Sequence, residues 1–311
     1  MFAATLNQMI FLLVFLAAGY AMAKTGYLPS GAAKVLSRLE NMIFLPALVL
    51  GNFITNFTVK VIRSEWQTLL ISLGIEIIVI PLAILSARLC AKDSFTRRIY
   101  TYGLAFSNFG FMGNAVVSAL FPDYFFTYLI FTLPLWMCIY LWGVPYLLMK
   151  HEGGRGVREA LRPLLNPMLI AMLIGAVIGL SGLAMPSAVT TIIDAAGSCM
   201  SPVAMLLTGI TVAEGKLGVI LRRKSIYAVT LLRLVVFPLV FVLVEWALSH
   251  WIEIPQAIAV CALCSLAMPL GLNTVVVPSA YGEDTSDAAG MALVSHVLSL
   301  VTIPILFTFC L

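Results

Sequence analysis

The chain has 311 residues, of which 61% are apolar and only 10% are charged. Because a soluble globular domain carries about a quarter charged residues, this composition excludes an ordinary water-soluble protein. The formal net charge is +4, a value that gains meaning only once the charges are sorted by side of a membrane.

The apolar residues gather in stretches that are long enough to cross a bilayer. A spanning helix needs roughly 20 mainly apolar residues, because each residue rises about 1.5 Å through a hydrocarbon core about 30 Å thick. Ten such stretches lie near residues 6–23, 35–56, 66–87, 99–120, 124–149, 164–182, 187–213, 225–249, 256–280 and 287–310. The first lacks a basic leader and a small-residue cleavage site, so we expect it to be retained as a span. The predicted fold class is an all-α membrane protein with ten transmembrane helices.

The loops between these stretches differ in charge. With the N-terminus outside, the inner loops carry fifteen Lys and Arg residues, and the outer loops carry only Lys60 and Arg63. Positively charged loops stay on the cytoplasmic side, so both termini are predicted to be extracytoplasmic in a multi-pass protein of the cell membrane. The basic residues are then topology signals, and no nucleic-acid partner is expected.

The two halves of the chain align with each other at a nearly constant offset. The aligned pairs are Gly19 with Gly175, Gly26 with Gly182 and Pro46 with Pro202 at 156 residues, Pro81 with Pro238 at 157, and Asn114 with Asn273 at 159. Each half contains five expected spans, an odd number, so the second half enters the membrane in the opposite sense. We therefore predict a first repeat at 1–149, a cytoplasmic linker at 150–163 and an inverted second repeat at 164–311.

The fourth and ninth spans contain residues that interrupt a helix. Residues 107–114 read SNFGFMGN and residues 268–273 read MPLGLN. Proline removes a backbone donor, and glycine tolerates non-helical dihedral angles. Asn114 and Asn273 each stand where an N-cap would precede a resumed helix.

Each of these spans is therefore predicted to form two half-helices, with the two breaks meeting near the midplane. Half-helix N-termini suit a carboxylate, and the opposing C-terminal carbonyls suit sodium or water. The alternative is that the glycines only pack closely beside a proline kink, since Gly and Pro are frequent in membrane helices.

Three runs of residues carry a resemblance to a known family. The runs are N-F-G-F-M-G at 108–113, A-M-P-L-G at 267–271 and S-L-V-T-I-P at 299–304. They resemble the auxin efflux carrier family, particularly its bacterial permeases. The resemblance implies the ten-helix inverted-repeat fold also found in bile acid sodium symporters, with a scaffold, a transport domain and substrate bound where helices 4 and 9 cross.

The resemblance also implies substrates and site residues. Plant members carry auxin, and bacterial relatives are associated with malonate, malate and similar acids. The residues expected to line or shape the crossing are Asn108, Gly110, Gly113, Asn114, Pro269, Gly271, Asn273 and Thr274. Plant members have proline where this chain has Ala115 and Thr274, and the family often has Ser-Thr where this chain has Ser295-His296. These departures put auxin itself in doubt as a substrate.

A charged residue inside an expected span is expected to have a partner or a function, because buried charge in a bilayer is costly. Glu76 and Arg233 are related by the offset of 157. We predict that they form an ion pair that holds the repeats together, with a role in coupling or substrate binding as the alternative.

Three other polar positions lie within expected spans. His296 is predicted either to couple protons to transport or simply to be hydrogen-bonded inside the bundle. Asn41 and its neighbour Glu40, like Asp194, precede the internal proline of their span. They either face a cavity or, for the two carboxylates, reach toward the headgroups.

The function expected from these observations is secondary active transport of small organic anions, such as malonate or malate, by alternating access. No cofactor is expected, and the coupling ion is Na+ or H+ in a symporter. The partners are the anion and the lipid bilayer, and a homodimer is left open.

The alternatives are an anion channel, a carrier of auxin-like aromatic monocarboxylates, and an intramembrane enzyme. Ser295 and His296 are adjacent, and helix neighbours do not face each other, so a catalytic dyad is not expected. The Cys261–Cys264 pair lacks the second pair that would complete a zinc site. No Walker-type glycine loop is present either, which disfavours ATP-driven transport.

Overall fold

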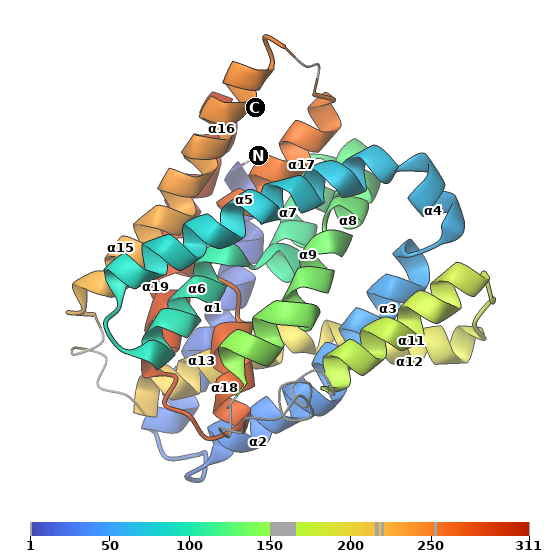
Figure 1. Ribbon diagram of the computed structural model, residues 1–311. Coiled ribbons are helices and arrows are strands. Elements are labelled where there is room, and N and C mark those ends of the chain that lie inside the picture. Colours follow the sequence, from blue (N-terminus) through green and yellow to red (C-terminus); the bar gives the residue numbers. More distant parts are fainter. Residues whose placement is uncertain (1, 150–165, 215–217, 219–220, 252–253, 311) are drawn as a thin grey trace, which may run out of the picture.

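A computed structural model describes residues 2–149, 166–214, 218, 221–251 and 254–310. The predicted linker at 150–163 lies outside these residues. Within the described ranges the regular structure is helical, with one isolated bridge between two extended segments, so the all-α class is confirmed (Figure 1).

In the described part of the chain, five helical stretches are long and apolar enough to cross a membrane. They are Trp66–Cys90, Pro122–Leu148, Ser187–Glu214, Lys224–Leu248 and Ser286–Cys310. The first is the single helix α5 and the last is α19. The other three are each made of several shorter helices. Pro122–Leu148 contains η3 (Pro122–Tyr124), α8 (Phe125–Phe131), α9 (Leu133–Cys138) and η4 (Ile139–Leu148), and Ser187–Glu214 contains α12 (Ser187–Ser198) and α13 (Met200–Glu214). Lys224–Leu248 contains α15 (Lys224–Leu231), η6 (Leu232–Val236) and α16 (Phe237–Leu248).

The remaining expected spans are shorter or interrupted helices. Two are single helices, α1 (Phe2–Lys24) and α11 (Pro167–Ser181). One contains a π-helical turn, in the order α2 (Ala32–Leu39), η1 (Glu40–Phe44) and α3 (Leu45–Asn56). Two are broken by a non-helical stretch. One consists of α6 (Ser94–Ala105) followed by η2 (Phe109–Gly113) and α7 (Asn114–Leu120), and the other of α17 (Gln256–Ala267) followed by α18 (Asn273–Ala280). A short helix, α4 (Val59–Ser64), was not predicted.

Local sequence signals set several helix ends. The Asp93 carboxylate accepts a hydrogen bond from the Thr96 N–H at 2.8 Å and begins α6. The Asn166 side chain caps α11 in the same way. That helix ends at Gly182, whose φ of 68° is left-handed, and Gly26 has a φ of 74° just after α1. Glycine suits both places because a Cβ disfavours this conformation.

The helices pack into two groups. The flanking group consists of α1, α2, η1, α3, α11, α12 and α13, with α1 against α13 and α3 against both α11 and α12. The crossing group consists of η2, η4, η6 and helices α5 to α9 and α15 to α19, in which α5 packs on α6 and α17 on α8. In Figure 1, α3, α11 and α12 lie together at the lower right, away from α15 and α16. The groups meet where α19 contacts α1 and α13, and where α18 contacts α2.

Glycines bring the helices of the flanking group into backbone contact. A Cβ on Gly19 of α1 would overlap the carbonyl of Leu206 in α13. A Cβ on Gly175 of α11 would lie 2.9 Å from the carbonyl of Leu50 in α3. Gly19 and Gly175 are 156 residues apart, and so are Leu50 and Leu206, so the same offset relates the two contacts. Small residues permit such close approach of membrane helices.

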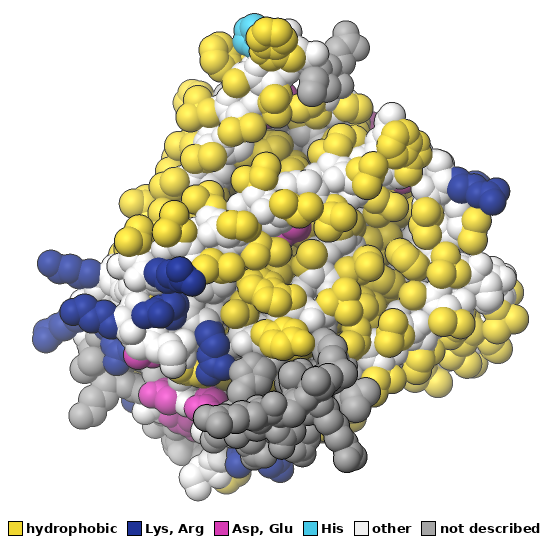
Figure 2. Space-filling model, viewed as in Figure 1, with side chains coloured by type: hydrophobic (Ala, Val, Ile, Leu, Met, Phe, Trp, Pro, Cys, Tyr) yellow, Lys and Arg dark blue, Asp and Glu magenta, His cyan; other side chains and the backbone are white. Residues whose placement is uncertain are grey.

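The surface matches a protein surrounded by lipid. Figure 2 shows hydrophobic side chains over most of the visible face, with Lys and Arg gathered mainly toward its lower end. Large apolar side chains on α5 point outward, including Ile77 and Ile78, which are 64% and 66% exposed. In water such a surface would aggregate, whereas in a bilayer it meets acyl chains.

The contact of Gly19 with Leu206 gives a stability test. Gly19→Ala should lower the thermal stability of the purified protein by at least about 1 kcal/mol, because overpacking forces the two backbones apart. Gly74→Ala in α5 is the matched control, since no atom lies within 4 Å of the position of its new Cβ. That control should be neutral or slightly stabilising, as Ala has the higher helix propensity. Equal melting temperatures for Gly19→Ala and the wild type would contradict this account of the packing.

Candidate functional site

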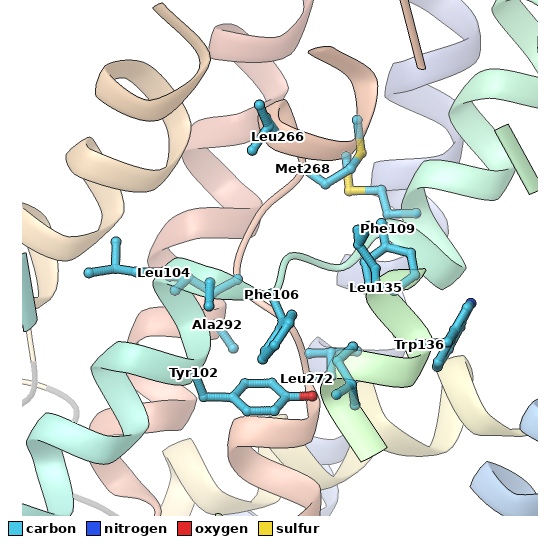
Figure 3. Packing of buried hydrophobic residues seen from close by; sticks show 14 of the residues in the cluster. Tyr102, Leu104, Phe106, Phe109, Leu135, Trp136, Leu266, Met268, Leu272 and Ala292 are labelled. Atoms are coloured by element: carbon cyan, nitrogen blue, oxygen red, sulfur yellow. The ribbon is translucent and has the colours of Figure 1, made fainter. Parts of the chain in front are cut away.

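The breaks in the fourth and ninth spans pair directly with each other. Ser107 and Leu270 form an antiparallel bridge. The Asn108 N–H donates to the Pro269 carbonyl at 2.7 Å, and the Gly271 N–H donates to the Phe106 carbonyl at 3.3 Å. Figure 3 shows the extended stretch after Leu104 passing the stretch that runs from Met268 to Leu272. Both predicted interruptions are therefore present, and they lie against each other.

Three glycines make this contact compact. A Cβ on Gly271 would lie 3.0 Å from the Phe106 carbonyl, so it would press on the paired strand. A Cβ on Gly113 would overlap the Tyr128 hydroxyl, and one on Gly110 would lie 2.5 Å from the Trp136 ring. Gly110 and Gly113 therefore pack against the fifth span and shape the crossing.

Side-chain hydrogen bonds hold the extended residues in place. The Ser107 hydroxyl donates to the Ser265 carbonyl at 2.7 Å, and the Leu270 N–H donates to the Ser295 hydroxyl at 3.3 Å. On the other side of the crossing, the Thr274 hydroxyl donates to the Gly271 carbonyl at 2.8 Å. Polar backbone inside an apolar bundle is tolerated only when it is satisfied in this way.

His296 is fully engaged in the bundle. Its Nδ1 lies 2.7 Å from the Ala292 carbonyl, which can only accept, so Nδ1 carries the proton. Its Nε2, 3.0 Å from Asn108 Nδ2, is then the acceptor for that amide. The imidazole is 1% exposed and uses both nitrogens, which is the hydrogen-bonded alternative of the two predicted for it.

Neither predicted N-cap is formed. The fourth span resumes helix at Phe109, so Asn114 stands inside the resumed helix and its side chain makes no cap bond. Leu272 precedes α18, and the Asn273 amide donates instead to the Tyr102 hydroxyl at 2.9 Å. The N-cap prediction was wrong because the helix resumes at Phe109, six residues before the position that follows Asn114, and because Tyr102 is a nearby acceptor for the Asn273 amide.

Arg233 in η6 binds the ends of both first half-helices. Its guanidinium donates to the Leu104 carbonyl at 2.7 Å, near the end of α6. It also donates to the Ser265 and Met268 carbonyls at 3.1 and 3.4 Å, at the end of α17. The C-terminal carbonyls of a helix carry partial negative charge, so a cation here is favourable. The structure thus places an arginine where the sequence predicted sodium or water.

The predicted ion pair between Glu76 and Arg233 is not formed. Their charged groups do not come within 4.0 Å of each other, as those of Arg223 and Asp287 do. Glu76 is 2% exposed, and its Oε2 has no hydrogen-bond partner. Arg233 is near enough to act on Glu76 electrostatically, but its donors are used by carbonyls of the two breaks. The sequence showed the paired charges and could not show these acceptors.

The polar residues of the second span divide by their surroundings. The Asn41 amide donates to the Ser37 carbonyl at 2.7 Å and to the Val276 carbonyl of α18 at 3.1 Å, so it links the flanking and crossing groups. Glu40 is 0% exposed and does not reach the headgroups, which excludes one of its two predicted placements. Asp194 on α12 is exposed.

A cavity of about 360 Å³ lies beyond the crossing, at the other end of α18. Its lining includes Lys34 of α2, Thr211 and Glu214 of α13, Ser279 of α18 and Asp284 of the loop before α19. Hydrogen bonds from the side chain and the backbone of Ser286 hold the pKa of the Asp284 carboxyl below its ordinary value. The cavity therefore lies between the flanking and crossing groups and carries mainly acidic charge.

The site has the chemistry of a binding site built from helix ends. No group of three or more potential metal-ligating side chains (His, Cys, Asp or Glu) occurs among the described residues. What the crossing offers is backbone: carbonyl ends capped by Arg233, and the first N–H groups of η2, which have no backbone acceptor among the described residues. In α18 the N–H groups of Thr274 and Val275 already donate to the Gly271 and Leu272 carbonyls.

Paired helix breaks inside an apolar bundle define a multi-pass membrane protein. A sequence model of the family described as membrane transport protein (Mem_trans) matches residues 4–307. The chain therefore belongs to this family, the auxin efflux carrier family, and is a membrane transporter rather than an enzyme. No curated protein matches the chain.

The cap formed by Arg233 gives a prediction. Arg233→Leu should destabilise the protein by roughly 3 kcal/mol or more, because each buried acceptor left unpaired costs about 1–3 kcal/mol. Arg63→Leu, at an exposed position of α4, is the control and should be neutral. Thermal unfolding in detergent measures both. Adding Glu76→Gln should restore little of the loss, and a full return to wild-type stability would show that Glu76 was the main partner.

The packing of Gly113 gives a further prediction about stability. Gly113→Ala should lower thermal stability, because its methyl group would overlap the Tyr128 hydroxyl. Removing that hydroxyl with Tyr128→Phe should recover part of the loss, even though the hydroxyl normally donates to the Phe109 carbonyl at 3.1 Å. Additive losses in the double variant would mean that the two side chains do not compete for the same space.

Proposed function

We propose that the protein is a secondary active transporter of small organic anions, malonate- or malate-like carboxylates, that binds its substrate at the crossing. The observation that carries this proposal is the direct pairing of the two helix breaks at Ser107 and Leu270. Four helix ends converge there, two with partial negative charge and two with partial positive charge.

The charges at these ends favour an anion. Arg233 is 1% exposed and donates to both C-terminal ends, so it offsets their negative charge. The first N–H groups of η2, those of Phe109 and Gly110, have no backbone acceptor among the described residues, and neither has that of Asn273 in α18. The next two N–H groups of α18, those of Thr274 and Val275, donate to the Gly271 and Leu272 carbonyls. Each N-terminal end carries up to about half a positive charge. Glu76 offsets part of the charge of Arg233, but it binds neither N-terminal end. A carboxylate is the natural ligand for two such ends.

The residues have different parts in this proposal. Asn273 stands in the first turn of α18, and Asn114 follows η2 as the first residue of α7; the buried Asn114 Oδ1 has no hydrogen-bond partner among the described residues. They and Thr274 are the proposed polar contacts of the substrate. Asn108, Gly110, Gly113, Pro269 and Gly271 are proposed to set the shape of the crossing.

Alternating access is proposed to move the crossing group against the flanking group. Two glycine contacts related by one offset, between α1 and α13 and between α11 and α3, support two inverted repeats of five spans. The gathering of Lys and Arg toward one end of the molecule supports both termini on the extracytoplasmic side. The homodimer stays a prediction.

Counterflow in proteoliposomes tests the proposal. Vesicles that contain unlabelled malonate should transiently accumulate labelled malonate, because a carrier exchanges one bound solute for another. Currents without counterflow would show an anion channel instead. Exchange of indole-3-acetate in place of malonate and malate would show a carrier of aromatic monocarboxylates.

Two substitutions test whether this transport activity depends on the crossing. Asn273→Ala should raise the concentration of malonate needed for half-maximal exchange at least tenfold, which corresponds to about 1.4 kcal/mol of binding free energy. Asn52→Ala is the control, because its amide bonds only to the Leu48 carbonyl within α3 of the flanking group. Equal effects of the two substitutions would move the substrate site away from the crossing.

A further inference from the structure

Glu40 is a buried carboxylate for which the structure provides no partner. It begins the π-helical turn η1, between α2 and α3, and its residue exposure is 0%. Neither Oε1 nor Oε2 has a hydrogen-bond partner. An ionised carboxylate in such a place would lack both water and a counter-charge, which is a costly arrangement inside a membrane.

No charged group compensates Glu40 from the elements packed around it. Besides its helix neighbours α2 and α3, η1 contacts α11, α12, α13 and α18. The charged residues on these elements are Lys34, Arg38, Asp194 and Glu214. None of them bonds to Glu40, and α3, α11 and α18 carry no charged residue. Metal ions need several oxygen ligands, whereas a proton needs only the carboxylate itself.

The described cavity and Glu40 are connected by one segment of the chain. Ala33, Ser37 and Glu40 are spaced i, i+4 and i+7, so they follow one face of α2. Ala33 lines the cavity of about 360 Å³. Ser37, between them, is 0% exposed, and its hydroxyl donates to the Lys34 carbonyl at 3.2 Å. Glu40 therefore lies about two turns deeper than the cavity on the same helix face.

Asn41, the residue after Glu40, connects η1 to the crossing group. The Asn41 amide donates to the Val276 carbonyl of α18, the half-helix that follows the crossing. If Glu40 lost its proton, the carboxylate would have to gain water, and η1 would have to separate from its neighbours to admit it. A π-helical turn at this point adds to the argument, because such turns are frequent at functional sites.

We propose that Glu40 is a proton-binding site, loaded from the cavity beside Lys34, whose protonation holds η1 against α18. In transport it would serve as the proton-coupling residue, a role that rests on the proposed function. His296 is a weaker candidate, since both of its ring nitrogens are already bonded. Proton binding by Glu40 does not depend on which solute is carried.

Infrared spectroscopy of the full chain in lipid tests the binding directly. The carbonyl stretch of a protonated carboxylic acid is resolved from that of a carboxylate. At neutral pH the wild type should show an acid band that is lost in Glu40→Gln and unchanged in Asp194→Asn, whose carboxylate is exposed on the neighbouring α12. Glu40→Asp, which keeps the acid, should shift the band rather than remove it. Identical acid bands in the wild type and Glu40→Gln would overturn the proposal.

Two further measurements distinguish a proton from a metal cation at Glu40 and test whether Glu40 couples transport to protons. Replacing choline by sodium should leave the band in place, and its loss would show that a metal cation occupies the site instead of a proton. In proteoliposomes, Glu40→Gln should keep malonate exchange but lose accumulation driven by a pH gradient. Wild-type accumulation by this variant would remove the coupling role. If malonate is not carried at all, the proposed function fails while the infrared result still decides proton binding.

Discussion

The structure depends on satisfying backbone polar groups where two helices stop inside an apolar bundle. Each unpaired group in hydrocarbon costs several kcal/mol, so a broken helix persists only beside suitable partners. The two breaks here are partners for each other, through the bonds of Asn108 to Pro269 and of Gly271 to Phe106. Arg233 supplies the donors that the pairing cannot, and glycines keep the surrounding helices close enough for all of these bonds to form.

Composition and periodic patterns were sufficient to predict the class of the fold. The positions of the breaks and their meeting also followed from sequence, because glycine, proline and asparagine recur at matching depths in the two halves. The family resemblance carried by three short runs was confirmed. These predictions succeeded because they rest on local rules, namely helix length, backbone dihedral freedom and the missing donor of proline.

The partners of individual side chains could not be predicted in the same way. Glu76 and Arg233 are 157 residues apart, the offset that also relates Pro81 to Pro238, and this spacing suggested an ion pair. In the structure the guanidinium instead donates to three backbone carbonyls. The caps at Asn114 and Asn273 failed for a similar reason, since one helix resumes earlier and Tyr102 takes the other amide. Such outcomes depend on which acceptors come within 3 Å, and sequence patterns do not contain that distance.

The two glycine contacts bear on how the chain is assembled during synthesis. The first helix of each half lies against the second span of the other half, α1 on α13 and α11 on α3. The two halves of the chain are therefore not packed independently, because the first helix of each half packs against a helix of the other. When the ribosome has released only the first half, the seam around Gly19 has no backbone to lie against. The packing of α1 seen in the structure requires α13, so it can be completed only after α13 has been made.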